Sequence, residues 1–425
     1  LRDKKVIDRI AEIYEKEGSD CWFTDEPKKF LGEDHNSDDF EKLNDIVEVW
    51  FDSGSTHSFV LEKRKDLKWP ADMYLEGSDQ HRGWFHSSLL ESCGTRGRAP
   101  FNSILSHGFV VDGKGLKMSK SSGNVISPED ILKNYGADIL RAWVASSDYS
   151  EDLRIDKTIL TQHAESYRKI RNTFRFILGN IKDNFVKQPM QSLNTKDLNE
   201  LEQYILHKVY TLNNSVKEHL KEYNFHKLYK ELLNFCALDL SSFYFDIRKD
   251  VLYCDNLNSK KRKDCIIVLN IVLDSLLKWF APILVFTTDE IYSLVGKDNK
   301  SIHEYTFPEI PKKFENLVLD EKWKQLFKIK QEANIAIEEK RASKEIGSSL
   351  EAELNITVDN KNFELLEGLD LAEYFITSKA EKFKSKDKEE LTIKVKKTKG
   401  TKCPRCWKIL ESKCARCERA IKENI

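Results

Sequence analysis

The sequence lacks several features that define other classes of protein. No apolar run approaches the roughly 18 residues that a transmembrane helix needs, so we expect no membrane partner. Only 17 glycines and 9 prolines occur among 425 residues, which excludes a collagen-like chain. Net charge is nearly absent as well, because 69 Lys and Arg face 70 Asp and Glu, and 40% of the residues are hydrophobic. This composition excludes an intrinsically disordered protein, and the neutral total argues at first against a nucleic-acid partner.

The cysteines are few and unevenly placed. Their odd total of nine argues against a full disulfide framework. Five are scattered, and we expect them to be small core hydrophobes in a reducing compartment: Cys21, Cys93, Cys236, Cys254 and Cys265. The chain begins with Leu1 rather than methionine and continues with a charged, helix-forming stretch. We therefore expect no signal peptide, and a piece of a longer protein that acts in the cytoplasm.

The length predicts about three domains, and the sequence pattern divides the chain into four parts. Residues 1–152 begin with a helix and an acidic stretch and then alternate short strands with helices, an α/β pattern. Residues 153–310 contain long helices with apolar positions three and four apart, which predicts an all-α bundle. Residues 311–398 form a small α+β module, and residues 399–425 hold the remaining cysteines.

Individual elements follow from the same patterns. In the first part we expect strands over 46–51, 71–76 and 104–111, with Gly77-Ser78-Asp79 capping the next helix. Ser127-Pro-Glu-Asp130 is expected to open a helix, with serine as the cap and proline in the first turn. Further helices are expected over 204–220, 225–245, 265–280 and 322–344, and further strands over 350–358 and 391–395.

The four remaining cysteines form a tight cluster near the end of the chain. Cys403-Pro-Arg-Cys406 and Cys414-Ala-Arg-Cys417 are CxxC pairs separated by seven residues. Each pair places two sulfurs on one tight turn, and two such turns supply the four thiolates of a tetrahedral structural zinc site. The alternative is two redox-active CxxC motifs, but so short a tail can hardly bury a core without a metal. We therefore expect one structural Zn²⁺ at this site.

The same tail is strongly basic. From Lys394 onward, eleven Lys and Arg face three Glu, which gives a net charge of +8. Four thiolates and one Zn²⁺ reduce this charge to about +6. Trp407 follows the second cysteine, and its ring can stack on a base, so the tail favours an RNA contact. The alternative is a solvated charged face on which Trp407 packs the metal module.

A lysine- and serine-rich loop precedes the helix that opens at Ser127. It reads Gly113-Lys-Gly-Leu-Lys117-Met118-Ser119-Lys120-Ser121-Ser-Gly-Asn124. Its glycines give mobility, its lysines positive charge and its serines hydrogen-bond donors. Such a loop can close on a polyphosphate and stabilise the charge of a leaving pyrophosphate. On composition alone, a surface loop without such a function is the commoner outcome.

Several segments carry a resemblance to a known family. Lys117-Met-Ser-Lys-Ser121 resembles the KMSKS signature of class I aminoacyl-tRNA synthetases, and Glu48-Val-Trp-Phe-Asp-Ser-Gly54 is similar to a segment of the isoleucine, valine and leucine subgroup. Tyr74-Leu-Glu-Gly-Ser-Asp-Gln-His-Arg-Gly-Trp-Phe85 resembles the adenylate-binding turn of the isoleucyl enzymes. Residues 135–149 and 167–176 follow in the bacterial isoleucyl pattern, and the last cysteines resemble that family's zinc module.

This resemblance covers nearly the whole chain in order, and it implies a fold and an activity. The implied fold is part of a Rossmann-type catalytic domain, followed by an all-α anticodon-binding bundle, an α+β junction module and a zinc ribbon or knuckle. The implied activity is ATP-dependent conversion of L-isoleucine to isoleucyl-adenylate and its transfer to tRNA(Ile). Magnesium would accompany ATP, and the enzyme would be a cytoplasmic monomer.

The resemblance also implies roles for individual residues. Lys117 and Lys120 match the lysines that contact the phosphates of ATP, for which a mobile point charge is suited. The wider ATP and adenylate site is implied to comprise Glu76, Gly77, Asp79, Gln80, His107, Lys117, Met118, Ser119, Lys120 and Ser121. Trp50 and Trp84 match walls of the isoleucine pocket. Without the family, helix capping, a core histidine and core tryptophans would explain these side chains equally well.

The implied tRNA contacts lie in the bundle and the tail. Arg168, Arg171 and Arg175, together with Lys169, are spaced to share a helix face, and Trp407 would add a contact from the zinc module. A solvated face is the alternative for each of these residues. The sequence contains no His-x-Gly-His motif of this class and no editing domain. We therefore expect the chain to be the C-terminal part of a longer synthetase and to form no adenylate by itself.

Two other interpretations remain open. The valine enzyme is the nearest relative within the class, although the segment from Leu75 to Gln80 and the cysteine tail favour isoleucine. A non-catalytic zinc protein that binds RNA and derives from a synthetase would use only the bundle and the tail. Because such a protein would need neither the loop 117–121 nor the turn at Glu76, their presence argues against it.

Overall fold

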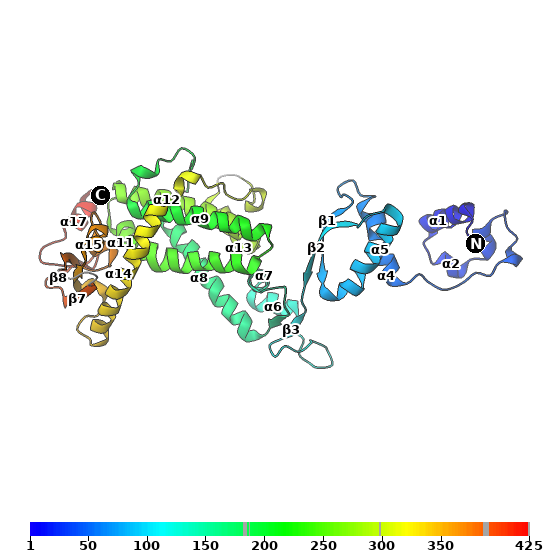
Figure 1. Cartoon of the computed structure of the whole chain (residues 1–425), viewed down its shortest axis with the longest axis horizontal. Coiled ribbons are helices and arrows are strands. Elements are labelled where there is room, and N and C mark those ends of the chain that lie inside the picture. Colours follow the sequence, from blue (N-terminus) through cyan, green and yellow to red (C-terminus); the bar gives the residue numbers. More distant parts are fainter. Residues whose placement is uncertain (182–184, 187, 297–298, 386–390, 424–425) are drawn as a thin grey trace. The chain divides into compact units, whose positions relative to one another are not determined.

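The computed structural model describes residues 1–181, 185–186, 188–296, 299–385 and 391–423. The chain forms two compact units, Leu1–Phe109 and Val110–Ile425 (Figure 1). None of the described helices is long and apolar enough to cross a membrane. The four-part division expected from the sequence stays a prediction.

The first unit begins with short helices. They are α1 (Lys4–Glu17), α2 (Cys21–Thr24), α3 (Pro27–Leu31) and the 3-10 helix η1 (Ser37–Asp39). The helix α1 starts at Lys4 because the carboxylate of Asp3 accepts the backbone N–H of Lys5 at 2.8 Å. The guanidinium of Arg9 donates to the carbonyl oxygen of Leu31 at 2.5 Å, which ties α1 to the end of α3. The helix expected at the start of the chain is confirmed.

A pair of parallel strands forms the centre of the first unit. Its elements are β1 (Ala71–Gly77), the 3-10 helix η3 (Ser78–Arg82), α5 (Trp84–Arg96) and β2 (Phe101–His107). The Tyr74 ring is buried and stacks on Trp84, with 4.2 Å between the ring centroids. Its hydroxyl lies 3.1 Å from the hydroxyl of Ser88 on α5. The strand expected over 71–76 and the α/β pattern are confirmed.

One strand prediction in the first unit is wrong. Residues 46–51 form no strand; the chain is irregular and exposed until α4 (Val49–Gly54), which the π-helix η2 (His57–Leu61) follows. Glu48 starts α4 because its carboxylate accepts the backbone N–H of Trp50 at 2.7 Å. Among the described residues no neighbouring strand pairs with this segment, so the local cap decides its structure.

Two further details of the first unit differ from expectation. The strand expected over 104–111 is interrupted at Gly108, because β2 pairs with β1 whereas Val110 begins a strand of the second unit. Gly77 is the N-cap residue of the short 3-10 helix η3, without a side-chain cap hydrogen bond, and Gly77-Ser78-Asp79 does not cap α5. Where α5 begins, Oε1 of Gln80 accepts the backbone N–H of Trp84 at 2.9 Å. Local residue propensities predict neither the change of pairing partner at Gly108 nor the contact between the Gln80 side chain and the backbone of Trp84.

The second unit begins with another pair of parallel strands. Its first elements are β3 (Val110–Asp112), α6 (Pro128–Tyr135), α7 (Ala137–Ser146) and β4 (Leu153–Ile155). Ser127 caps α6 by accepting the backbone N–H of Glu129 at 3.2 Å, and Pro128 is the first helical residue, as expected. Ile131 and Trp143 form a small buried cluster with residues of β4.

A bundle of long helices follows, and Figure 1 shows α8, α9 and α12 running alongside one another. The helices are α8 (Lys157–Ile181), α9 (Glu200–Lys221), α10 (Phe225–Asn234), the π-helix η5 (Phe235–Phe245), α11 (Asp246–Cys254), α12 (Lys260–Phe280) and α13 (Val285–Val295). The helix α12 buries residues on every side, including Trp279 and Phe280, which is typical of a central helix. The helices expected over 204–220, 225–245 and 265–280 are confirmed.

The remaining residues form a mixed module. Its elements are α14 (Leu317–Ala342), β5 (Ala352–Val358), α15 (Asn360–Leu365), α16 (Leu371–Tyr374), β6 (Lys379–Lys384) and β7 (Leu391–Lys397), with β5 between the other two strands. The tail adds β8 (Thr401–Lys402), β9 (Ile409–Leu410) and α17 (Ala415–Glu423). Short 3-10 helices lie at Thr195–Asp197, Ile302–Glu304, Lys312–Phe314 and Ser349–Glu351. The helix expected over 322–344 and the strands expected over 350–358 and 391–395 are confirmed, whereas β6 was not expected.

A buried charge network connects the bundle to this module. The guanidinium of Arg248 on α11 donates to both carboxylate oxygens of Glu202 on α9 at 2.7 Å each, and to Glu373 on α16 at 2.7 Å. Lys261 on α12 donates to the other oxygen of Glu373 at 2.7 Å. Glu202 is fully buried, and both of its oxygens are bound by the arginine. Three helices of the bundle are therefore held to α16 by paired charges.

Candidate functional site

The predicted adenylate-binding residues of the first unit gather at the carboxyl ends of β1 and β2. Gly77 lies opposite His107 in the parallel register, and Glu76 precedes Gly77 at the same sheet edge. A Cβ built on Gly77 would lie 2.7 Å from Oδ1 of Asp79 and 3.7 Å from the His107 ring, so only glycine leaves this approach open. Glu76 and Asp79 are exposed, which leaves their carboxylates accessible. Ligands of open parallel sheets bind at this edge.

The two predicted pocket tryptophans lie beside the same turn. A Cβ built on Gly83 would lie 3.1 Å from the Trp50 ring and 2.6 Å from Oε1 of Gln80, so the exposed indole and the amide flank this glycine. The indole N–H of Trp84 donates to the carbonyl oxygen of Ser53 at 2.9 Å and thereby ties α5 to α4. Trp84 thus has a packing role as well, through its stack on Tyr74, whereas Trp50 offers a free ring face.

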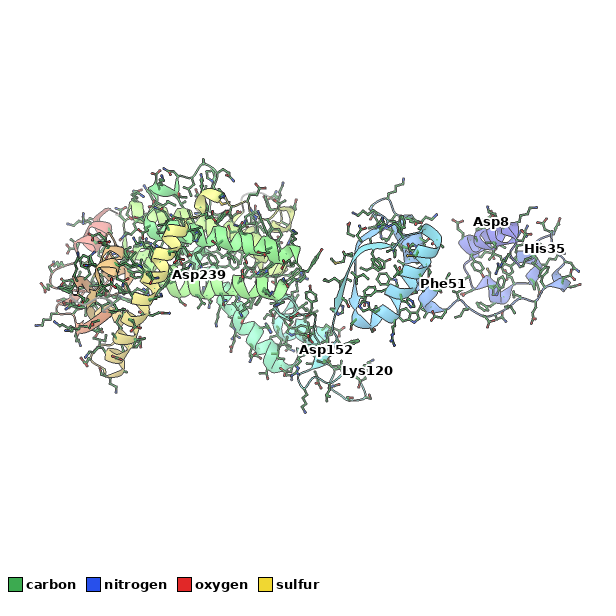
Figure 2. All side chains as sticks on the ribbon, in the orientation of Figure 1. Asp8, His35, Phe51, Lys120, Asp152 and Asp239 are labelled. Atoms are coloured by element: carbon green, nitrogen blue, oxygen red, sulfur yellow. The ribbon has the colours of Figure 1, made fainter. Side chains whose placement is uncertain are left out.

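The lysine- and serine-rich loop belongs to the second unit. Lys117 and Lys120 are exposed, and Figure 2 shows Lys120 on the projecting loop. Neither lysine forms an ion pair with any described residue, so both ammonium groups remain available for a polyanion. Met118 packs against the buried cluster that contains Ile131 and Trp143, whereas Ser119 and Ser121 place their hydroxyls 3.1 Å apart. The loop therefore combines an anchored methionine with free cationic groups.

The four clustered cysteines come together in space. Their sulfurs all lie within 4.8 Å of one another, and those of Cys406 and Cys414 are 3.9 Å apart. A tetrahedral Zn²⁺ with bonds of about 2.3 Å separates its sulfurs by about 3.8 Å, so the donor set fits this metal. Although burial opposes it, hydrogen bonds from the backbone N–H groups of Cys406 and Arg405 lower the pKa of Cys403 to about 7, whereas burial raises the pKa of Cys406 and of Cys417. The cluster is thus compatible with a four-thiolate zinc site.

Local backbone geometry explains how the segment that carries the four clustered cysteines, here called the knuckle, is formed. The short strands β8 and β9 pair as an antiparallel hairpin that carries the first CxxC pair. Gly400 has φ 130°, and a Cβ there would lie 2.3 Å from the carbonyl oxygen of Leu410, so the hairpin requires glycine at this position. The backbone N–H of Trp407 donates to Cys403 at 3.0 Å and closes the turn.

The knuckle is fastened to α11 of the bundle. The guanidinium of Arg416, between Cys414 and Cys417, binds both carboxylate oxygens of Asp250 at 2.5 and 2.8 Å. Arg405 donates to the carbonyl oxygen of Tyr253 at 3.2 Å, and Cys254 is buried against the cysteine cluster. These contacts show that the arginines inside the two CxxC motifs hold the metal module in place.

Among the scattered cysteines, Cys93 does not fit the expectation. It is exposed on α5, whereas Cys21, Cys236, Cys254 and Cys265 are buried. The helix α5 buries only Phe85, Ser88 and Ser92, so position 93 falls on its solvent face.

The predicted arginines of the bundle are exposed on α8. Arg168, Arg171 and Arg175 fall within one third of the helix circumference, whereas Lys169 points about 100° away from Arg168. Arg171 and Arg175 line a surface hollow of about 600 Å³ between α8 and α13, together with Phe174, Leu178, Thr287, Glu290 and Leu294. The structure thus brings two of the three arginines to one concave surface and leaves Lys169 outside it.

Trp407 is 60% exposed, so it does not pack the knuckle interior. It adopts φ 63°, and Nζ of Lys402 lies 5.6 Å from its ring centroid. An exposed ring beside a cation offers a stacking surface for a base.

Comparison with known proteins assigns the class. Residues 2–156 match the family model of class I tRNA synthetases (I, L, M and V), and residues 202–356 match that of the anticodon-binding domain of tRNA ligase. Among solved structures, LeuRS of Agrobacterium radiobacter, in a ternary complex with tRNA and LeuAMS, gives a TM-score of 0.53 at 15% identity. The match covers 75% of this chain and 36% of the LeuRS chain. At 15% sequence identity, the likeness shows the fold alone. The fold is that of a class I tRNA synthetase segment with an anticodon-binding domain.

The curated relatives show which enzymes of that class the chain resembles. Isoleucine–tRNA ligase of Pelagibacter ubique is 65% identical over 416 residues, which cover 98% of this chain and 46% of the relative. Isoleucine–tRNA ligase of Zymomonas mobilis is 43% identical over 434 residues, which cover 100% of this chain and 46% of the relative. Over nearly its whole length the chain is similar to isoleucine–tRNA ligases. It spans less than half of the length of these relatives.

Sequence reasoning did not identify several residues that organise these sites. Asp112 and Asn124 join the two ends of the lysine- and serine-rich loop, and the hydrogen bond from Asn124 holds the pKa of Asp112 below its ordinary value. Their positions at the two ends of a recognised motif could have suggested that they support the loop. The role of Arg416 was harder to predict, because a charged residue between two cysteines of the cluster has many possible partners.

Proposed function

We propose that this chain is part of an isoleucine–tRNA ligase that activates L-isoleucine with ATP and transfers it to tRNA(Ile) during translation in the cytoplasm. The observation that carries this proposal is the 65% identity to such a ligase over 98% of the chain. The reaction has two steps, formation of isoleucyl-adenylate with release of pyrophosphate and then attack by the 3′-terminal hydroxyl of the tRNA. We propose that the ligase acts as a monomer.

The proposed roles of the residues follow from their chemistry. The Glu76 carboxylate at the end of β1 would pair with the ammonium group of isoleucine, and Asp79 and Gln80 would hydrogen-bond the ribose. His107 would lie on the adenine side, Gly77 would admit the substrate, and the Trp50 ring would contact the branched side chain. These groups position the substrates, since no side chain attacks them covalently in this proposal.

The loop 117–121 would act on the phosphates. The free ammonium groups of Lys117 and Lys120 would stabilise negative charge as it develops on the leaving pyrophosphate, and the serine hydroxyls would donate hydrogen bonds. Lysine suits this role because its charge is compact and its stem flexible. Bound with ATP, Mg²⁺ would neutralise part of the phosphate charge.

Isoleucine-dependent exchange of pyrophosphate into ATP tests the proposal in the full-length ligase that contains this chain. We expect exchange with isoleucine, and a loss of about 100–1000-fold in Lys120→Ala, because a donor aimed at the developing charge is removed. Lys114→Ala, at the exposed start of the same loop, is the matched control and should stay within about twofold.

The other outcomes identify the alternatives. We expect the 425-residue chain alone to show no exchange, because it carries no His-x-Gly-His motif. Exchange with valine but not isoleucine in the full-length protein would assign the valine reaction. A full-length protein that binds tRNA without any exchange would instead be a non-catalytic RNA-binding derivative.

We further propose that tRNA contacts the arginine face of α8 and the zinc knuckle. Arg171 and Arg175 lie side by side in the hollow between α8 and α13 and make no ion pair with the described residues. Replacing both by alanine should weaken tRNA binding by about 10–100-fold for each phosphate contact, since a charged hydrogen bond contributes about 1.5–3 kcal/mol. Titration of tRNA at several salt concentrations should also show a smaller salt dependence.

Lys169→Ala is the matched control for these arginines. Lys169 is exposed on the same helix but points about 100° away from Arg168, so its loss should change affinity by less than about twofold. Equal losses in the lysine and arginine variants would mean that α8 contributes only diffuse charge, and no loss in either would exclude this face.

We also propose that Trp407 stacks on a tRNA base and that the four cysteines hold one structural Zn²⁺.

A further inference from the structure

Two side chains close the neck of the lysine- and serine-rich loop. Asp112 ends β3, and Asn124 lies at the far end of the loop, where its Nδ2 amide donates to Oδ2 of Asp112 at 2.9 Å. The other carboxylate oxygen, Oδ1, accepts the backbone N–H groups of Lys114 at 2.9 Å and Leu116 at 2.8 Å. One carboxylate therefore binds both the first turn of the loop and its exit.

Asn124 also reaches inside the loop. Its Nδ2 amide donates to the carbonyl oxygen of Lys117 at 3.2 Å, and its Oδ1 accepts the backbone N–H of Ser119 at 3.0 Å. The amide thus donates twice and accepts once, which fixes its orientation. Met118, between these two backbone contacts, packs into the buried cluster. The segment 117–119 is therefore held by its backbone on one side and by its methionine on the other.

The tip of the loop is built differently. The backbone N–H of Ser122 donates to Ser119 and that of Gly123 to Lys120, each at 3.2 Å, so the tip is a tight turn. Lys120 and Ser121 on this turn are exposed. Figure 2 labels Lys120 on the loop. Contacts with β3 and the buried cluster hold the neck, whereas the hydrogen bonds of the tip with described residues stay within the loop. This division separates a fixed base from a part that can approach a ligand.

The neck also lies against the start of the helical bundle. A Cβ on Gly113 would lie 2.3 Å from the Asp156 carboxylate, so glycine is required there. The other oxygen of that carboxylate accepts the backbone N–H of Ile159 at 2.7 Å in the first turn of α8. The neck therefore lies between β3 and the beginning of a long helix, and both supports are regular elements.

We propose that Asp112 and Asn124 are positioning residues that hold Lys117 and Ser119 in place for the activation step, while Lys120 moves with the tip. This inference rests on the proposed function, because it assigns the loop to the phosphates of ATP. A loop held at its neck loses less conformational freedom when its ammonium groups bind the substrate, so more of the binding energy is available to stabilise the transition state. Without the contact between Asp112 and Asn124, here called the clasp, the same lysines would be present but poorly placed.

Pyrophosphate exchange by the full-length ligase tests this proposal. Asn124→Ala removes all three contacts of the amide, and we expect kcat to fall by about 10–100-fold with the KM for isoleucine within about twofold. Asn362→Ala is the matched control, because Asn362 makes the same kind of amide–carboxylate contact with Asp359, at 3.0 Å, in the C-terminal module. The control should keep kcat within about twofold of the wild type.

An exchange of the two residues separates positioning from a general loss of stability. Asn124→Asp alone places two carboxylates against each other and should lower kcat at least as far as Asn124→Ala. In Asp112→Asn/Asn124→Asp, the amide and the carboxylate trade places and their hydrogen bond returns in the opposite direction. The backbone N–H groups of Lys114, Leu116 and Ser119 keep their acceptors, whereas the carbonyl oxygen of Lys117 loses its donor and faces a carboxylate oxygen. We therefore expect a partial recovery of kcat, to within about tenfold of the wild type.

Three results would count against the clasp. One is a kcat of Asn124→Ala within twofold of the wild type; another is an exchanged pair no more active than Asn124→Asp. The third is a parallel fall in kcat, melting temperature and tRNA affinity, which would assign Asn124 a purely structural role. A wild-type ligase without any isoleucine-dependent exchange would instead overturn the proposed function on which the clasp depends.

Discussion

Replacing Arg248 by methionine is expected to lower the free energy of unfolding of the second unit by about 3–5 kcal/mol. The guanidinium is the partner of both oxygens of the fully buried Glu202, at 2.7 Å each, and of one oxygen of Glu373. Methionine preserves much of the volume but leaves the Glu202 carboxylate, among the described residues, with a single partner, the Tyr244 hydroxyl at 3.2 Å. Urea unfolding, followed by tryptophan fluorescence and circular dichroism, measures the loss.

Two companion variants test the cause of that loss. Arg248→Met combined with Glu202→Met removes both buried charges while Lys261 still pairs with Glu373, so most of the stability should return. Lys249→Met is the matched surface control, since Lys249 pairs with Asp246 on the exposed side of α11 and should change stability by less than about 1 kcal/mol. A loss below about 1 kcal/mol for Arg248→Met, or a double variant weaker than the single one, would contradict this role.

Local sequence patterns predicted the helices of the second unit well. The pattern over 204–220 falls within α9, because preferential burial of one face imposes the helical period. The apolar positions over 265–280 fall within α12, which is buried on every side. The strand β6 gave no such signal. Its sequence, Lys379 to Lys384, is mostly charged, and it becomes a strand because β5 offers it an open edge with which to pair in parallel. Pairing between distant segments cannot be inferred from the composition of either one.

The candidate sites divide in the same way. The CxxC pairs and the loop 117–121 are contiguous, so their chemistry is visible in the sequence itself. The residues that hold such segments in place are distant in the sequence. Arg416 binds Asp250, 166 residues earlier, and the partners of Arg248 lie on two other helices. Position along the chain gives no information about such pairs, because the fold alone brings them together.

Removal of the metal is expected to unfold the cysteine knuckle and to weaken tRNA binding. We expect one zinc per chain by metal analysis, and its loss in Cys403→Ser or Cys417→Ser, because a structural zinc site requires all four thiolates. The binding free energy of such a site, about 10–16 kcal/mol in small zinc domains, is also the folding free energy of the module. Cys93→Ala, an exposed cysteine outside the cluster, should leave the zinc content unchanged.

The position of the knuckle determines what its unfolding should do. Arg405 and Arg416 fasten it to Tyr253 and Asp250 on α11, so a folded knuckle presents Trp407 and its lysines from a fixed place on the bundle. We therefore expect Cys417→Ser to reduce tRNA affinity by about tenfold or more while the bundle keeps its helical circular dichroism. Metal-free protein with unchanged tRNA affinity would remove the knuckle from RNA binding, and wild-type protein without zinc would contradict the metal assignment. If Arg416→Met, with zinc retained, also lowers affinity, the position of the knuckle matters as well as its fold.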